Sequence, residues 1–367
     1  MRDEEKKYWI GFSAFAGIGP KRFALLRNYF GSAKKAWEAS FEELSQVGLE
    51  EKLLTSFVNF REKADLNSYF LRLRENRIEC QTFLDKNYPK NLKKIDNPPF
   101  ILYVKGEIKA QDDLALAVVG TRKMTNYGRE VTEILTKQII ACGLTVVSGL
   151  ARGIDTVAHQ TALKNGGRTI AVLACGLDMI YPPENKKLAE EIVKSHGALV
   201  SEFPPGCQAV PGNFPARNRI IAGLSLGTLV IEGAQDSGSL ITARHAVEQG
   251  REVFAVPGPI TSPNSNGPFW LIKQGAKLVA NVDDILEELN ISVGRKNKAC
   301  LPKVREIKPE NPEEERILMI IKDEPKHIDE IVRETGMNVG QVMSLLTMME
   351  IKGLVKSLGK MMYSINN

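Results

Sequence analysis

The residues of this chain that could do chemistry are arginines and glycines placed next to short apolar runs. Residues 144–155 read Leu-Thr-Val-Val-Ser-Gly-Leu-Ala-Arg-Gly-Ile-Asp. The β-branched run predicts a buried strand, and Gly149 and Gly153 predict a sharp loop that a ligand can approach closely. A following helix, over about 154–165, would direct its unpaired N–H groups at the loop, where Arg152 adds a full positive charge. This pattern predicts a site that receives a phosphate.

Two further places carry residues of the same kinds. Gly120 and Arg122 follow an apolar run at 116–119, and Phe-Pro-Ala-Arg-Asn-Arg occupies 214–219. A groove for one nucleic-acid strand needs cations for phosphates, backbone N–H groups at loop ends and an aromatic surface for a base. The residues that we expect to meet these needs are Gly120, Arg122, Gly149, Arg152, Gly153, Lys164, Phe214, Arg217, Asn218 and Arg219.

Several of these side chains have a structural alternative. Arg122 and Arg217 could form surface ion pairs, and Phe214 could be a core residue. Arg219 could pair inside the domain, with Glu202 or Glu232. Asp155 and His159 stand four residues apart on the predicted helix, where a helix cap and a packed histidine explain them better than a catalytic pair does.

The elements that would position these residues alternate along the middle of the chain. Apolar runs that predict strands are separated by stretches of helical pattern, the runs being 116–119, 144–148, 169–173, 198–201, 228–231 and 252–256. This alternation predicts an α/β fold with a doubly wound, mostly parallel sheet. Ligands of such sheets bind outside the carboxyl ends of the strands. Because residues 120–122, 149–153 and 232–239 all fall at those ends, we expect them to share one cleft.

Other patterns flank this middle part. Residues 1–75 have a helical pattern whose break at Gly17-Ile18-Gly19 resembles the hairpin of helix-hairpin-helix and sterile-alpha-motif (SAM)-like modules. That hairpin could hold a DNA phosphate or could simply pack a helical bundle. Residues 291–311 are polar, basic and proline-bearing, which predicts a linker. Residues 312–367 resemble a winged helix with a mostly apolar third helix, which favours protein contact or packing at least as much as base reading. We therefore expect domains at 1–75, 76–290 and 312–367.

Composition narrows the classes of function. The net charge of +5 is compatible with a polyanionic partner. Five scattered cysteines and four histidines show no metal-ligand spacing, so we expect no metal and no cofactor. No apolar run approaches the ~20 residues of a membrane span, and the first residues lack an apolar signal core. We expect a cytoplasmic protein without a membrane partner.

Six motifs in fixed order carry a resemblance to a known family. They are Ser148-Gly-Leu-Ala-Arg-Gly-Ile-Asp155, Ala171-Val-Leu-Ala-Cys-Gly-Leu-Asp178, Ser201-Glu202, Phe214-Pro-Ala-Arg-Asn-Arg-Ile-Ile-Ala-Gly-Leu-Ser225, Ser237-Gly-Ser-Leu-Ile-Thr-Ala-Arg244 and Gly250-Arg-Glu-Val-Phe-Ala-Val-Pro-Gly258. Together they closely resemble the DprA family, also called Smf, of DNA-processing proteins in bacterial natural transformation. The flanking helical and winged-helix parts also fit the family's three-part layout.

The resemblance implies a fold and a function. It implies a Rossmann-like domain that dimerises and binds single-stranded DNA without marked sequence preference. It also implies that the protein protects incoming DNA and loads RecA onto it, displacing or bypassing single-strand binding protein, with no catalytic turnover. By resemblance, the Gly-Thr-Arg loop at 120–122 and the segment 214–219 line the family's DNA pocket.

Two other functions remain open from the sequence. The fold also resembles that of nucleoside-monophosphate phosphoribohydrolases, but their Pro-Gly-Gly-x-Gly-Thr-x-x-Glu signature is not matched. Here Glu232 stands four residues after Thr228 instead of three, which in a strand turns the side chain to the opposite face. No Gly-x-Gly-x-x-Gly pattern follows the first strand, so a dinucleotide enzyme is disfavoured. A winged-helix regulator is the other alternative.

Overall fold

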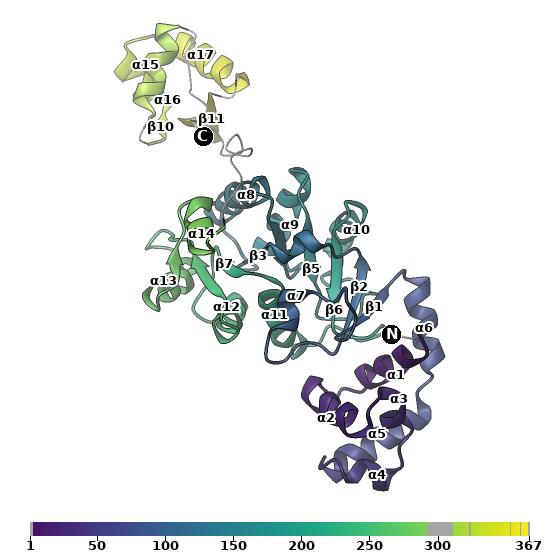
Figure 1. Ribbon diagram of the computed structural model, residues 1–367. Helices are drawn as coiled ribbons and strands as arrows, with labels where there is room; N and C mark the ends of the chain where they lie inside the picture. The colour runs from purple at the N-terminus through teal and green to yellow at the C-terminus, as the bar shows by residue number, and fades with distance from the viewer. Residues whose placement is uncertain (1–2, 292–310, 323, 353, 360, 366–367) are drawn as a thin grey trace. The chain divides into compact units, whose positions relative to one another are not determined.

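The computed structural model (Figure 1) describes residues 3–291, 311–322, 324–352, 354–359 and 361–365. Contacts divide the chain into two units, Met1–Asn297 and Lys298–Asn367. The predicted linker at 291–311 falls almost wholly outside the described residues. Within the described ranges, no helix has the length and apolar character that crossing a bilayer demands.

Six helices open the first unit, and they lie beside one end of its sheet (Figure 1). They are α1 (Asp3–Ala14), α2 (Pro20–Phe30), α3 (Ala33–Glu38), α4 (Phe41–Ser45), α5 (Glu51–Lys63) and α6 (Leu66–Glu75). Ser32 caps α3 by accepting from the N–H of Lys35, and Ser40 with Glu43 forms a capping box on α4. The apolar side chains of these helices share one hydrophobic cluster with the sheet, including Tyr103 and Leu199. The helices and the sheet are therefore packed on a common core.

A nine-stranded sheet forms the centre of this unit, in the order β1-β2-β6-β5-β4-β3-β7-β8-β9. The bounds are β1 (Glu79–Thr82), β2 (Ile101–Gly106), β3 (Ala115–Val119), β4 (Thr145–Ser148), β5 (Thr169–Val172), β6 (Ala198–Ser201), β7 (Gly227–Val230), β8 (Glu252–Ala255) and β9 (Lys277–Leu278). In this order, every pair of neighbours from β6 through β5, β4, β3, β7 and β8 to β9 is parallel. The pairs β1–β2 and β2–β6 are antiparallel. The predicted doubly wound, mostly parallel sheet is confirmed.

Helices cover both faces of the sheet (Figure 1). One face carries α8 (Asn126–Ala141), α9 (Ile154–Lys164), α10 (Lys186–Lys194) and α14 (Val282–Glu288). The other carries α7 (Lys90–Lys93), α11 (Asn213–Leu224), α12 (Gly238–Glu248) and α13 (Asn266–Lys273). Alternate strand residues serve the two faces, since Leu116 and Val118 of β3 join one cluster while Ala117 and Val119 join the other. This explains why β3 is apolar throughout.

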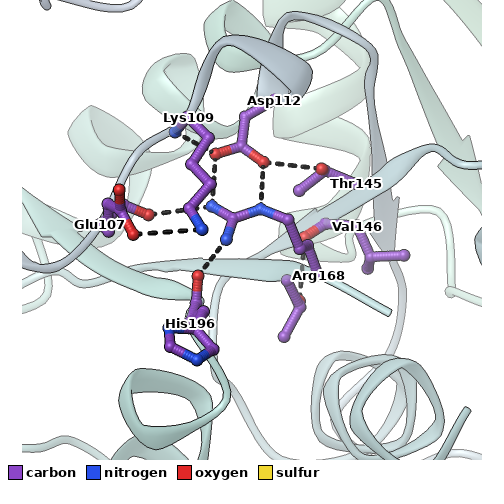
Figure 2. Close-up of polar contacts among 8 residues, drawn as sticks. Glu107, Lys109, Asp112, Thr145, Val146, Arg168 and His196 are labelled. Atoms are coloured by element: carbon purple, nitrogen blue, oxygen red, sulfur yellow. Dashed lines mark hydrogen bonds and ion pairs between the residues drawn. The ribbon is translucent and has the colours of Figure 1, made fainter. Parts of the chain in front are cut away.

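Arg168, one residue before β5, ties together the edge of the sheet where the parallel strands begin (Figure 2). Its Nε and Nη2 donate to the carboxylate of Asp112 at 2.9 and 2.7 Å. The same carboxylate accepts from the hydroxyl of Thr145 at 2.7 Å, and Arg168 also donates to two backbone carbonyls in neighbouring loops. Because both side chains are largely buried, this ion pair fixes the strand starts opposite the cleft.

The second unit consists of α15 (Pro312–Ile320), β10 (Lys326–His327), α16 (Ile328–Thr335), α17 (Val339–Ile351), β11 (Val355–Gly359) and β12 (Met362–Ile365). Three helices and a three-stranded sheet in the order β10-β12-β11 form the winged helix that the sequence predicts. On α17, Val342 and Leu346 belong to the core, whereas Val339, Met343 and Met348 are exposed. The apolar character of this helix is therefore only partly explained by packing.

Candidate nucleic-acid interface

A cleft opens where the strand order reverses, at the carboxyl ends of β4, β3 and β7. A cavity of about 490 Å³ there is lined by residues of three loops and of α11, among them Gly120, Arg122, Ala151, Phe214 and Ser237. A much smaller hollow adjoins it and shares Arg122, Ala151, Phe214 and Arg217. The prediction that residues 120–122, 149–153 and 232–239 meet in one cleft is confirmed, as expected at a topological switch point.

Two glycines allow the loops to approach this closely. Gly153 has φ +77°, in the left-handed region, and a Cβ there would collide with the backbone of Thr121 and Arg122. A Cβ on Gly149 would lie 2.5 Å from a guanidinium nitrogen of Arg217. The glycines thus allow close packing within the floor of the cleft. The sequence had predicted them for a different purpose, the close approach of a ligand.

A buried charge pair forms that floor. The Arg217 side chain, on a residue only 4% exposed, donates to the carbonyls of Gly149 and Val172, and the N–H of Gly149 donates to Asp155 at 3.0 Å. Burial lowers the pKa of Arg217 to about 10, an effect that Asp155 opposes, so the guanidinium stays charged at neutral pH. Burial raises the pKa of Asp155, while Arg217 and two backbone N–H donors act in the opposite direction. The Gly149 peptide is therefore held between the two charges.

This arrangement differs from the predicted phosphate site at the start of the helix. The loop N–H groups of Gly149 and Ala151 already donate to Asp155, and the N–H of Ile154 donates to the carbonyl of Thr121 at 3.2 Å. A carboxylate of the protein occupies the position in which an anion was expected. Asp155 is a structural residue here, in agreement with the sequence analysis, which favoured a helix cap over a catalytic pair.

Helix α11 begins at Asn213, so the segment 214–219 lies wholly on this helix, and the helix sets how its side chains are distributed. At 100° per residue, Phe214, Arg217 and Asn218 fall on one face, while Arg219 turns away from it. Arg219 lines neither cavity, and it donates to Glu202 and to the carbonyl of Asn97. It holds the domain together, in agreement with the structural alternative.

Asn218 is also occupied within the protein. Its Oδ1 accepts from Nε of Arg217 at 3.2 Å, and its Nδ2 donates to the carbonyl of Gly238 at 3.2 Å. Since the residue is 8% exposed, it positions Arg217 and the start of α12. The predicted contact of Asn218 with a phosphate or base edge would have to break these bonds.

An arginine and two rings lie together at the rim of the two cavities. The guanidinium of Arg122 lies 5.2 Å from the ring centroid of Phe214, and the ring of Tyr181 meets Phe214 edge-on at 5.7 Å. Phe214 is half-buried and belongs to none of the hydrophobic clusters, so the core alternative for this residue is disfavoured. Tyr181, 45% exposed, was not among the predicted site residues, although its aromatic type and its place after a strand end gave a signal.

The remaining predicted cations differ in position. Arg152 lines the smaller hollow and donates from Nε to Glu184 at 2.7 Å, in an exposed pair that contributes little stability and that a phosphate can replace. Lys123, not predicted, lines the larger cavity and is exposed. Lys164 is exposed at the last turn of α9, at the end of that helix farther from the cleft, and lines neither cavity.

Two further titratable residues near the cleft have structural partners. Glu232 is buried and accepts from the N–H and hydroxyl of Thr125 at 2.9 and 2.6 Å, which anchors the start of α8. Both carboxylate oxygens of Glu232 thus accept a bond from the protein, and Glu232 lines neither cavity, which disfavours the role of a catalytic carboxylate. His159 is fully buried with Nδ1 2.7 Å from the Thr169 hydroxyl, and burial lowers its pKa to about 3. Among the described residues, no three His, Cys, Asp or Glu side chains gather as a metal site would require.

The fold and the cleft define the class of protein: a Rossmann-like domain with a ligand cleft at its topological switch point, followed in the same chain by a winged helix. The cleft has the buried Arg217 in its floor and an arginine beside an aromatic ring at its rim. The family described as DNA recombination-mediator protein A matches residues 79–290, and the DprA winged helix domain matches residues 302–359. The chain belongs to this DprA/Smf family of DNA-processing proteins.

Individual relatives agree with this assignment. The chain is 35% identical to Protein Smf of Synechocystis sp. over 99% of both chains, and 40% identical to Protein Smf of Escherichia coli over 85% of this chain and 84% of that one. It resembles the X-ray structure of DprA from Streptococcus pneumoniae, with a TM-score of 0.67 and 36% identity over 77% of this chain and 97% of that one. A structure of DNA processing protein A from Helicobacter pylori, described for its single-stranded DNA binding mode, matches with a TM-score of 0.52 and 31% identity over 59% of this chain and 97% of that one.

Proposed function

We propose that this protein binds single-stranded DNA in the switch-point cleft and acts as a recombination mediator. The observation that carries the proposal is the pair formed by Arg122 and Phe214 at the rim of the two cavities. A single strand offers phosphates and base faces at every nucleotide, and an exposed guanidinium beside a half-buried ring suits both. The relative from Helicobacter pylori, described for single-stranded DNA binding, supports the same ligand.

The finer role rests on the family. We propose that the protein acts in the cytoplasm as a homodimer, protects incoming single-stranded DNA during natural transformation, and loads RecA onto it in the presence of single-strand binding protein. A non-enzymatic role agrees with the cleft, since the carboxylates Asp155 and Glu232 are both engaged by the protein itself.

The proposal is tested by equilibrium binding of fluorescent single- and double-stranded oligonucleotides of equal length over a salt series. We expect preference for the single strand, and the Arg122→Gln variant should reduce the log–log salt slope by about 0.7, the value for one lost phosphate contact. Lys164→Gln is the matched control, because Lys164 is an exposed cation outside both cavities, and it should leave affinity and slope unchanged. Equal binding of both DNA forms, or an unchanged slope in the folded Arg122→Gln variant, would refute the assignment.

A further inference from the structure

A second groove, of about 720 Å³, lies beside the cleft, between the amino-terminal helices and the loop that follows β6. The ends of α1 and α5 and the first turns of α6 form one wall, and residues 202–207 form the other. We propose that this groove binds the single strand where it leaves the cleft, so that one molecule holds the strand at two successive sites. This inference rests on the proposed function of the cleft.

The groove and the cleft meet at the start of α11. Asn213 lines the groove, and the next residue, Phe214, lines both cavities of the cleft. Consecutive Cα atoms are only about 3.8 Å apart. The side chain of Asn213 donates to the carbonyls of Ala174 and Gln208, both at 3.1 Å, which holds this junction in place. A strand bound over Phe214 therefore reaches the groove without passing another element of the fold.

The charges along the groove favour a polyanion. Lys63 and Arg72 are exposed, line the groove and have no ion-pair partner among the residues that the structure describes. The two acidic side chains of the lining are already engaged. Asp65 accepts from two N–H groups at the start of α6, and Glu202 pairs with Arg219. Because the Glu202–Arg219 pair is neutral as a whole, Lys63 and Arg72 set against the carboxylate of Asp65 leave a net charge of about +1 along the groove.

Aromatic side chains that pack on the core of the first unit also line the groove. Phe15, Phe60 and Tyr69 line it and are half-buried, and the rings of Phe15 and Phe60 lie 5.4 Å apart. Stacking of bases on such rings does not depend on sequence, because every base has an aromatic face. Arg72 extends from α6 to Gly206 on the opposite wall, since a Cβ added to Gly206 would lie 2.9 Å from Nη1 of Arg72. This cation therefore spans the groove. Cations interleaved with rings are the features that a single strand requires.

Binding of oligonucleotides of two lengths distinguishes the groove from the cleft, because only the longer one can reach both. Fluorescent oligothymidylates of about 6 and about 25 nucleotides would be titrated over a salt series, the shorter being close to the smallest site of a single-strand groove. The Lys63→Gln/Arg72→Gln double variant should bind the short probe like the wild type. For the long probe its log–log salt slope should fall by about 1.4, that is, by two phosphate contacts at 0.7 each. Arg74→Gln is the control, because Arg74 is exposed on the same helix but turned about 200° from Arg72 and outside the lining.

Each outcome decides between the sites. An unchanged slope for the long probe in the double variant would overturn the groove proposal and leave the cleft proposal intact. Loss of short-probe binding in the double variant would also overturn it, since these residues would then belong to the first site. Failure of the wild type to bind either probe would refute the cleft proposal and, with it, this inference. The melting temperature should not change in any variant, because all three substituted side chains are exposed.

Discussion

Arg217 provides a sharp test of the cleft, because its sequence position and its place in the structure predict different behaviour. As a phosphate contact, it would affect DNA affinity and salt dependence without affecting stability. In the structure it is a buried cation that donates to the carbonyls of Gly149 and Val172 and neutralises Asp155. We therefore expect Arg217 to act as a positioning residue.

The perturbation is Arg217→Met, which keeps much of the side-chain volume and removes the charge. Removing one partner of a directly contacting buried ion pair costs about 3–5 kcal/mol. We take this as the upper limit of the loss here, because the Gly149 peptide lies between the two charges. Asp155, 6% exposed, would keep the N–H donors of Gly149 and Ala151 and lose the compensating guanidinium charge. Urea unfolding should show this loss as a lower midpoint with an unchanged m-value. Asp155→Asn combined with Arg217→Met should recover part of the loss, which a double-mutant cycle measures.

The same variant separates positioning from DNA contact. We expect Arg217→Met to weaken single-strand binding through a displaced 149–153 loop, with the salt slope unchanged. Arg122→Gln should show the opposite pattern, with unchanged stability and a slope lower by about 0.7. A folded Arg217→Met protein with wild-type stability and a reduced slope would refute the reasoning and return Arg217 to the set of phosphate contacts.

Three further predictions concern stability and the second unit. Because burial lowers the pKa of His159 to about 3, below the ~6.5 of an unfolded histidine, its contribution to stability is complete above pH 6.5. That contribution falls by up to about 1.4 kcal/mol per pH unit between pH 6.5 and 3. In urea unfolding, the free energy of unfolding of His159→Gln should therefore fall less between pH 7 and pH 5 than that of the wild type. Arg168→Met leaves Asp112 buried and unpaired, so we expect a loss of about 3–5 kcal/mol in urea unfolding and no change in DNA affinity at matched folded protein. A chain ending at residue 305 should keep the single-strand affinity of the full chain. The reason is that residues 312–367 contain nine Asp and Glu and only seven Lys and Arg, so they add no net positive charge. A lower affinity of the truncated protein in the same binding assay would contradict this.

The sheet was predictable from the sequence because its strands are buried on both faces. Ala198–Ser201 is buried at every position and apolar up to its last residue, and the predicted and observed strands have the same bounds. The loops at the strand ends follow from that pattern, so the location of the cleft was predictable too. Helix α14 (Val282–Glu288) was not predicted, although Asn281 and Asp284 form a capping box that the sequence displays.

The roles of individual side chains in the cleft were less predictable. Helix α11 begins at Asn213, with Pro215 in its first turn, where proline is tolerated because the N–H it lacks would be unpaired. The prediction that placed Arg219 in the cleft did not take into account that, on this helix, Arg219 turns away from Phe214 and Arg217. The partner of Arg217, the carbonyl of Val172, is 45 residues away in sequence. No local pattern can indicate such a contact, so a buried clamp and an exposed phosphate contact have the same sequence signature.

The division between a paired floor and a free rim has a consequence for base preference. The floor's polar groups are engaged with one another: Asp155 holds loop N–H groups, Arg217 holds carbonyls, and Asn218 bridges Arg217 to Gly238. A base edge that reached the floor would find these groups already bonded to one another, whereas Arg122 and Phe214 offer charge and an aromatic ring that suit any nucleotide. Oligonucleotides of equal length and different base composition should therefore bind with similar affinity. A preference of about 1–3 kcal/mol for one base, the size of a bidentate base contact, would show that a floor group exchanges its internal partner for the DNA.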